Sequence, residues 1–246
     1  MKIKGFTLVE IIITIVLLGI VAGIGLGILS KIFTGYVNTR TYTMLYFNAK
    51  FIAERIDREL RHAVPNSIRI GNSGKTLQFC EFKFGSFYKQ ISKDNITVYD
   101  NLSIKVGDNI SIYNTNPTKI YQSKERVYTI IDNSSYPILK LNKKIVKNSP
   151  ANRFFLILTP VTFFWYNGIL YRRFNYPINF SDFGDDISTC NDDPFCNIVS
   201  KYVKSITFNY SGPTLERNAI VFITIVMEKD NVVVKYNAVV HIRNVP

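Results

Sequence analysis

The chain has 246 residues, of which 47% are hydrophobic, 14% aromatic and 20% charged, and its formal net charge is +12. This composition is that of a folded chain, and the sequence contains no tandem repeat or low-complexity segment, which excludes repeat proteins and disordered tails. The basic excess is spread along the chain, so it does not by itself indicate a nucleic-acid-binding protein.

The first thirty residues hold the most informative pattern. Two lysines and a glycine precede an apolar pentapeptide closed by a glutamate, and twenty uncharged residues follow: Lys2, Lys4, Gly5, Phe6-Thr7-Leu8-Val9-Glu10 and residues 11–30. A twenty-residue helix spans about 30 Å, the thickness of a bilayer core. The run is too long for a secretory signal peptide and no small-residue cleavage site closes it. A plain signal anchor leaves Glu10 unexplained, because a carboxylate in hydrocarbon costs about 3 kcal/mol.

This N-terminus resembles the type IV prepilin leader of pilins and type II secretion pseudopilins, through Lys4-Gly5-Phe6-Thr7-Leu8-Val9-Glu10 and the apolar run. The resemblance implies that prepilin peptidase cleaves between Gly5 and Phe6 on the cytoplasmic face, and that the new amino group of Phe6 is N-methylated. In a filament of packed helices, the Glu10 carboxylate would pair with the ammonium of a neighbour's Phe6 and set the axial register. The alternative is a Glu10 that reaches the lipid headgroups.

The apolar segment carries glycines at every fourth position, Gly19, Gly23 and Gly27, which lie near one face of a helix. Small residues allow helices to approach closely in lipid, so we predict a helix-packing face. The alternative is that glycine is simply frequent in membrane helices. Each glycine also lowers helix propensity by about 1 kcal/mol relative to alanine, so this part could unwind during assembly.

The helical pattern continues beyond Ser30. Apolar residues recur at three- and four-residue steps, with charged residues largely on the other faces; the apolar stripe is Ala49, Ile52, Ala53, Ile56, Leu60 and Ala63. Pro65 closes the run. We therefore predict one helix from Phe6 to Ala63, roughly 87 Å long at 1.5 Å per residue and bent near Gly35, whose second half covers a sheet.

After Asn66 the pattern changes to short strands with tight turns. The predicted strands are residues 68–91, 96–99, 102–106, 110–113, 153–166, 169–174, 201–210, 219–227 and 232–242. Asn167-Gly168 is the strongest hairpin signal, and Asp230-Asn231 predicts a second hairpin. These strands indicate an antiparallel sheet, mostly in the second half of the chain, built as one domain or two small subdomains.

The sequence thus predicts an α+β, pilin-like fold in which a long N-terminal helix packs on a C-terminal antiparallel β-sheet domain. We divide it into a prepilin leader (1–5), a transmembrane or assembly half of the helix (6–30), an amphipathic half (31–64) and a periplasmic β-rich head (65–246).

Three cysteines and a local acidic cluster stand out. Cys190 and Cys196 enclose five residues and can form a disulfide in an oxidising periplasm, with Cys80 left over; the alternative pairs Cys80 with one of them. The surrounding carboxylates, at Asp182, Asp185, Asp186, Asp192 and Asp193, are weak calcium candidates, because their spacing is not that of an EF-hand loop. Turn formation or contact with a neighbour's basic face explains them equally well. Otherwise we predict no metal and no cofactor.

We expect no enzyme, since the catalytic motifs G-x-S-x-G and H-E-x-x-H and a phosphate-binding glycine loop are absent from the sequence, and His62 and His241 lie in structural segments. The densest basic region combines Lys140, Lys143, Lys144, Lys147 and Arg153, and Arg172-Arg173 is another basic pair. A solvated strand face uses lysines as well as a nucleic-acid site does, so nucleic acid is not an expected partner.

Softer motifs resemble the minor pilins of the mannose-sensitive haemagglutinin (MSHA) system, the MshO group in particular. They are Ser205-Ile206-Thr207-Phe208-Asn209-Tyr210, residues 214–218, residues 240–246, Val106-Gly107-Asp108 with 112–114, and Pro160-Val161-Thr162 with 170–172. The resemblance implies a low-abundance priming or tip-proximal subunit of a type IV pilus.

Its partners would be other pilins and minor pilins, prepilin peptidase, the inner-membrane assembly platform, and membrane lipid before assembly. Its location would be the inner membrane, in a single pass with a periplasmic head, and then the surface filament. The alternatives are a minor pseudopilin of a type II secretion system and a tip-borne adhesin or DNA-binding pilin.

Overall fold

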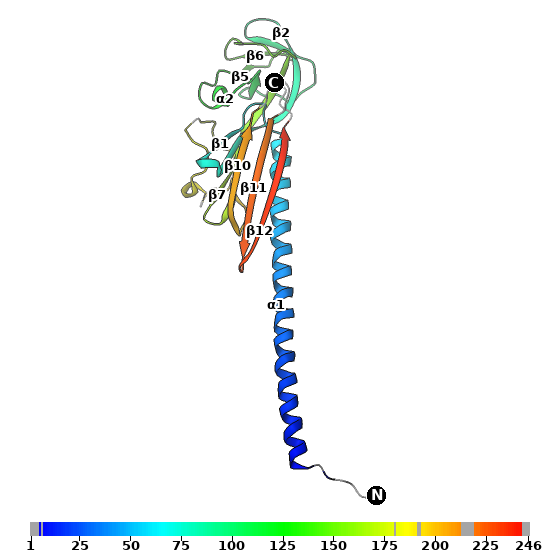
Figure 1. The fold of residues 1–246 in the computed structure, drawn as a ribbon. Coiled ribbons are helices and arrows are strands. Elements are labelled where there is room, and N and C mark those ends of the chain that lie inside the picture. Colours follow the sequence, from blue (N-terminus) through cyan, green and yellow to red (C-terminus); the bar gives the residue numbers. More distant parts are fainter. Residues whose placement is uncertain (1–4, 6, 180, 191–192, 213–218, 243–246) are drawn as a thin grey trace.

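A computed structural model describes residues 5, 7–179, 181–190, 193–212 and 219–242. Figure 1 shows a long helix, α1, whose first half projects alone and whose second half lies against a β-rich head. The α+β architecture predicted from the sequence, a long N-terminal helix followed by an antiparallel β-sheet domain, is confirmed.

α1 is one continuous helix of 53 residues, Leu8–Leu60, or about 80 Å at 1.5 Å per residue. Thr7 is its N-cap: its backbone is extended, and its Oγ1 accepts a hydrogen bond from the Glu10 N–H at 3.4 Å. The helical assignment runs unbroken through Gly35, so the predicted bend does not interrupt the helix.

The helix ends earlier than the sequence pattern predicts. Ala63 lies on the apolar stripe, but it leaves the helix and forms a β-bridge with Glu81. Next to it, the His62 carbonyl accepts a hydrogen bond from the Phe82 N–H at 2.9 Å. Pairing with the sheet therefore ends α1 at Leu60, before Pro65 could do so.

The head contains twelve strands and three short helical turns in the described part of the chain. In chain order they are β1 Arg69–Gly71, η1 Asn72–Gly74, β2 Thr76–Gln90, β3 Asn95–Val98, β4 Asn109–Ile112, α2 Thr118–Tyr121, β5 Val127–Asp132, β6 Ile138–Leu141, β7 Arg153–Tyr166, β8 Ile169–Phe174, η2 Ile187–Thr189, β9 Cys196–Ser200, β10 Val203–Ser211, β11 Ala219–Lys229 and β12 Val232–Ile242.

Among the described residues these strands form two antiparallel sheets. One has nine strands in the order β1-β2-β3-β6-β5-β4-β7-β8-β9, with an additional β2–β7 pairing; the other has three, β10-β11-β12. Both predicted hairpins form, and the turn residues have the positive φ angles that two-residue hairpins require: 44° and 81° at Asn167 and Gly168, 50° and 64° at Asp230 and Asn231.

The main core lies between α1, the three-stranded sheet and the strands β2, β7 and β8 of the nine-stranded sheet. The predicted stripe of α1 is buried throughout, and the core adds Leu45 one turn earlier. A second core, which includes Tyr88, Phe154 and Ile110, fills the part of the nine-stranded sheet away from α1. The head thus has more than one apolar centre, and only the first of them holds the helix.

Three strand predictions need correction. Residues 102–106 form no strand. Ile104 is buried in the second core, and the turn that follows ends at Gly107, whose φ is 94°. Residues 126–152, for which we predicted no element, contain β5 and β6. The single sheet expected mostly in the second half is two sheets, and the larger begins at Arg69.

Candidate assembly surface

The first half of α1 touches almost nothing else in the chain. Side chains from Leu8 to Arg40 are exposed, with a single intermediate position at Gly25. Large apolar residues dominate this stretch; Leu18, for example, is 68% exposed. Among the described residues, α1 is the one helix long and apolar enough to cross a membrane. Soluble monomers expose apolar patches of a few hundred Å² at most, so this surface needs lipid or other helices to cover it.

Glu10 lies in the first turn of this exposed helix. Its backbone N–H binds the Thr7 hydroxyl, and Thr7-Leu8-Val9-Glu10 has the S/T-x-x-E spacing of a capping box. A carboxylate in the first turn also opposes the positive end of the helix dipole. Glu10 has no ion pair with any described residue of its own chain. The cleavage and methylation prediction involves Phe6, which lies outside the described residues.

Comparison with known proteins bears on this same segment. Residues 1–26 match the prokaryotic N-terminal methylation motif. This motif, which includes the start of the exposed helix, indicates a type IV pilin-like or pseudopilin-like protein. Such proteins are structural subunits, and the motif implies processing by prepilin peptidase and assembly with other pilins. Neither a curated protein nor a solved structure matches the chain.

The three regularly spaced glycines are not explained by packing within the chain. A Cβ added at Gly19, Gly23 or Gly27 would meet no atom within 4 Å. These positions therefore leave a shallow, open strip on a pilin-like helix, which another helix can approach closely. Their role in helix packing remains a prediction.

The second half of α1 is held firmly to the head. Beside the buried stripe, the Arg172 guanidinium of β8 donates from Nε to Glu59 Oε2 at 2.8 Å, and Arg55 Nε lies 3.2 Å from Glu59 Oε1. Burial raises the pKa of the nearby Glu81 carboxyl, and the Glu59 charge raises it further. The buried stripe and the Arg172–Glu59 ion pair thus attach the second half of α1 to the head.

A row of exposed aromatic side chains on α1 was not singled out in the sequence. Phe33, Tyr36, Phe47 and Phe51 are between 49% and 69% exposed. Phe47 and Phe51 are one turn apart and lie roughly opposite the buried stripe, so they face away from the head. Apolar residues that recur at helical spacing outside the core stripe were the signal that could have revealed this second surface.

A groove runs between α1 and the tip of the β11–β12 hairpin. It has a volume of about 570 Å³, and its wall combines Phe33 and Tyr36 with the cationic side chains of Arg40 and Lys229. It joins the exposed aromatic row to the head, so a contact along the helix could continue onto the hairpin.

The cysteine loop follows β8. The structure contains a Cys190–Cys196 disulfide, while Cys80 is free and buried. Arg173 Nε lies 3.0 Å from Asp193 Oδ2, which ties this loop to the sheet. Arg172 and Arg173 are therefore both in ion pairs, with Glu59 and Asp193, and do not form an open basic pair for nucleic acid.

The described carboxylates considered for calcium accept hydrogen bonds from the loop itself and from the neighbouring strands β2 and β8. Asp186 Oδ1 accepts bonds from the Ser188 hydroxyl and N–H, which lower the pKa of the Asp186 carboxyl. Asp185 Oδ2 accepts from the Thr76 hydroxyl at 2.6 Å, and Asp182 Oδ1 from the Gly184 N–H at 2.6 Å. Asp192 lies outside the described residues. In the part of the chain that the structure describes, no three His, Cys, Asp or Glu side chains come together to hold a metal ion.

The same loop is clamped by Arg69. Its guanidinium lies between the rings of Tyr121 and Phe183, 4.1 and 4.0 Å from their centroids, and donates to the Asn179 and Asp182 carbonyls. Desolvation lowers the pKa of Arg69. Of the two histidines, His62 packs its ring on Phe82 with centroids 5.9 Å apart, and His241 is exposed on β12.

Proposed function

We propose that this chain is a minor pilin, a low-abundance structural or priming subunit of an MSHA-like type IV pilus that is assembled through α1. The observation that supports this best is the continuous apolar, exposed half of α1, whose start lies within a methylation motif. In the filament, the helices of other pilins would cover the surface that lipid covers before assembly.

The N-terminal chemistry follows from the prepilin resemblance. Prepilin peptidase would cleave between Gly5 and Phe6, and Phe6 would become the N-methylated first residue. Residues 1–5 would then be the leader, 6–30 the membrane or assembly half of the helix, 31–64 the amphipathic half and 65–246 the periplasmic head. The Cys190–Cys196 disulfide supports the location of the head in an oxidising compartment.

Glu10 would set the axial register. It lies in the first turn of α1 without a cation among the described residues of its own chain, so a neighbour's N-terminal ammonium is a partner of matching charge. An uncompensated carboxylate among apolar helices is costly, so only the register that joins the two charges would be stable.

A minor pseudopilin of a type II secretion system would share all of these N-terminal features. A minor pilin and a minor pseudopilin differ in their final location. A pilus subunit is part of the surface filament, so it is recovered when filaments are sheared from the cells. The inner-membrane assembly platform is a partner in both proposals.

The test uses mass spectrometry and sheared filaments from cells that produce the full chain. We expect mature protein that begins at N-methylated Phe6, and filaments that contain the subunit. Glu10→Ala should lower the amount in filaments at least tenfold while the protein is still processed. Glu54→Ala is the matched control, because Glu54 is an exposed glutamate on the same helix, near Lys50. Retained Met1 would refute the prepilin assignment, and normal incorporation of Glu10→Ala would refute the register role.

A further inference from the structure

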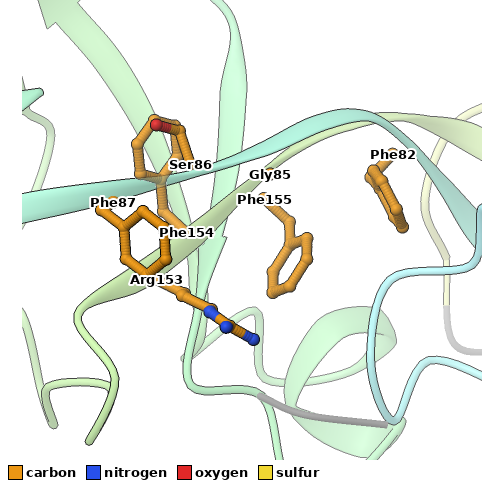
Figure 2. A pocket seen from close by; sticks show the side chains of 7 residues that line it. All are labelled: Phe82, Gly85, Ser86, Phe87, Arg153, Phe154 and Phe155. Carbon is orange, nitrogen blue, oxygen red and sulfur yellow. The ribbon is translucent and has the colours of Figure 1, made fainter. Parts of the chain in front are cut away.

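The head contains an aromatic pocket that assembly through α1 does not use. A cavity of about 330 Å³ opens between β2 and β7, and its lining includes Phe82, Gly85, Phe87, Arg153 and Phe155 (Figure 2). We call this cavity the aromatic pocket. Its volume lies at the lower end of the range for small-molecule sites.

Two neighbouring cross-strand pairs build the pocket. Gly85 lies opposite Phe155, and Phe87 lies opposite Arg153. Because Gly85 has no side chain, the Phe155 ring can lie across the strand; a Cβ at this position would come within 2.9 Å of two ring atoms. The centroids of the Phe82 and Phe155 rings are 5.3 Å apart. The strand register thus places the Phe155 ring over Gly85 and beside Phe82, and the cavity beside them is lined mostly by phenylalanine.

Arg153 supplies the charge of the pocket. Its guanidinium lies 5.2 Å from the centroid of the Phe87 ring, and it forms no ion pair or hydrogen bond with any described residue. Figure 2 shows its side chain extending between Phe87 and Phe155. A guanidinium held against a ring keeps its donors available for a carboxylate, to which it binds through two parallel hydrogen bonds.

The remaining polar group in the described wall is already satisfied. The Ser86 hydroxyl donates to Asp100. A sugar would need several hydrogen-bonding partners for its hydroxyls, whereas these walls offer phenylalanine rings and one cation. The chemistry therefore matches a molecule with one anionic group and an apolar body.

We propose that the aromatic pocket binds a small free organic carboxylate with an aromatic or branched apolar body. The body packs among Phe82, Phe87 and Phe155, and the carboxylate pairs with Arg153. Phe82 is hydrogen-bonded to His62, just beyond the end of α1, so the pocket lies at the opposite end of the helix from the methylation motif. An anion bound in the aromatic pocket would leave the exposed first half of α1 free for assembly.

The test is a ¹⁹F NMR titration of the full chain in detergent with 3-(4-fluorophenyl)propionate. We expect saturable binding whose dissociation constant rises at least tenfold in Arg153→Gln, because the charge-assisted bonds are lost. The neutral amide of the same probe should bind at least tenfold more weakly. Lys89→Gln is the matched control: it removes one positive charge from the neighbouring strand β2, outside the pocket wall, and should change the dissociation constant less than twofold.

A second variant tests the apolar wall. Phe87→Ala removes the ring that faces Arg153 at a side chain that is 48% exposed, so the fold should persist while affinity falls. Absence of saturable binding to the wild-type chain, or equal affinity in Arg153→Gln, would overturn the proposal. Binding of a peptide with a C-terminal phenylalanine but not of the free acid would also overturn it, since the occupant would then be another protein.

Discussion

Arg172 of β8 and Glu59 of α1 form an ion pair with 2.8 Å between Nε and Oε2, across the contact between helix and head. Both side chains are mostly buried, at 14% and 16% exposed. We predict that Arg172→Met lowers the free energy of unfolding by about 1.5–3 kcal/mol, the usual value of a hydrogen bond to a charged group. Chemical denaturation of the full chain in detergent measures this change.

The exposed pair Lys204–Glu228 is the control for Arg172. Lys204→Met should cost less than about 1 kcal/mol, because solvent screens a pair on the surface. Equal losses in the two variants would show that the helix-to-head pair contributes no more than a surface contact.

Substitutions at two apolar residues of α1 should affect different properties, one the stability of the fold and the other the assembly of filaments. Ile56 is fully buried in the main core, whereas Phe47 is 60% exposed and lies on the far side of the helix. We predict that Ile56→Ala lowers the free energy of unfolding by about 2–5 kcal/mol, and that Phe47→Ala changes it by less than about 0.5 kcal/mol. Phe47→Ala should instead reduce the amount of subunit in sheared filaments. Normal filament content in Phe47→Ala would show that the exposed aromatic row has no role in assembly.

The helix and the two hairpins could be predicted because their signals are local. A stripe at helical spacing locates the buried face of α1, and Asn167-Gly168 and Asp230-Asn231 mark turns that require positive φ. The nine-stranded sheet could not be predicted, because β2 pairs with β7 across a long stretch of sequence and bends through two register shifts. Such pairings depend on tertiary packing, which periodicity along one strand does not report.

Some features of the candidate site could likewise be predicted from the sequence, and others could not. The methylation motif and the apolar run are contiguous in sequence, so they could be recognised directly. The Arg172–Glu59 pair and the aromatic pocket join residues more than sixty positions apart. The disulfide is an intermediate case. The separation of six residues between Cys190 and Cys196 favours their pairing, but the sequence alone does not exclude a disulfide with Cys80.

The Cys190–Cys196 disulfide should stabilise the loop before β9. Closing a loop with a sequence separation of 6 restricts the unfolded chain by about 2 kcal/mol in the chain-entropy description. Replacing both cysteines by serine should lower the free energy of unfolding by about that amount. Denaturation measures the loss, and mass spectrometry of the oxidised wild type should show one free thiol, Cys80. A free thiol at Cys190 or Cys196, or three free thiols, would contradict the bond.

Alkaline pH should weaken the fold through buried acids near β2. Burial raises the pKa of the Cys80 thiol from 9.0 to about 12, and it also raises the pKa values of Tyr121 and Tyr176. Unfolded chains lose these protons at lower pH than folded ones, so the contribution of these three groups to the free energy of unfolding is fully present below about pH 9. It should fall as the pH rises from 9 toward 12.

Cys80→Ala tests the thiol's share of this effect. The variant should lose stability less steeply above pH 9 than the wild type, by up to about 1.4 kcal/mol per pH unit. At pH 8, iodoacetamide should label Cys80 only in unfolded protein, because the thiol is fully buried and protonated. Equally fast labelling of the native chain would contradict this assignment.

The glycine strip on α1 allows a test of helix packing with its own internal control. Gly23 lies in the strip with Gly19 and Gly27, whereas Gly25 points about 200° away from Gly23 on the same helix. A Cβ at either Gly23 or Gly25 meets no atom of the chain within 4 Å, so a leucine at either position leaves the fold intact and favours the helix. If another helix lies against the strip, Gly23→Leu should reduce filament content at least tenfold while Gly25→Leu reduces it less, because only the first places a large side chain in the contact. Filament content is measured by immunoblot of sheared fibres against total membrane protein. Equal content in the two variants would show that the glycine spacing reflects only the frequency of glycine in membrane helices.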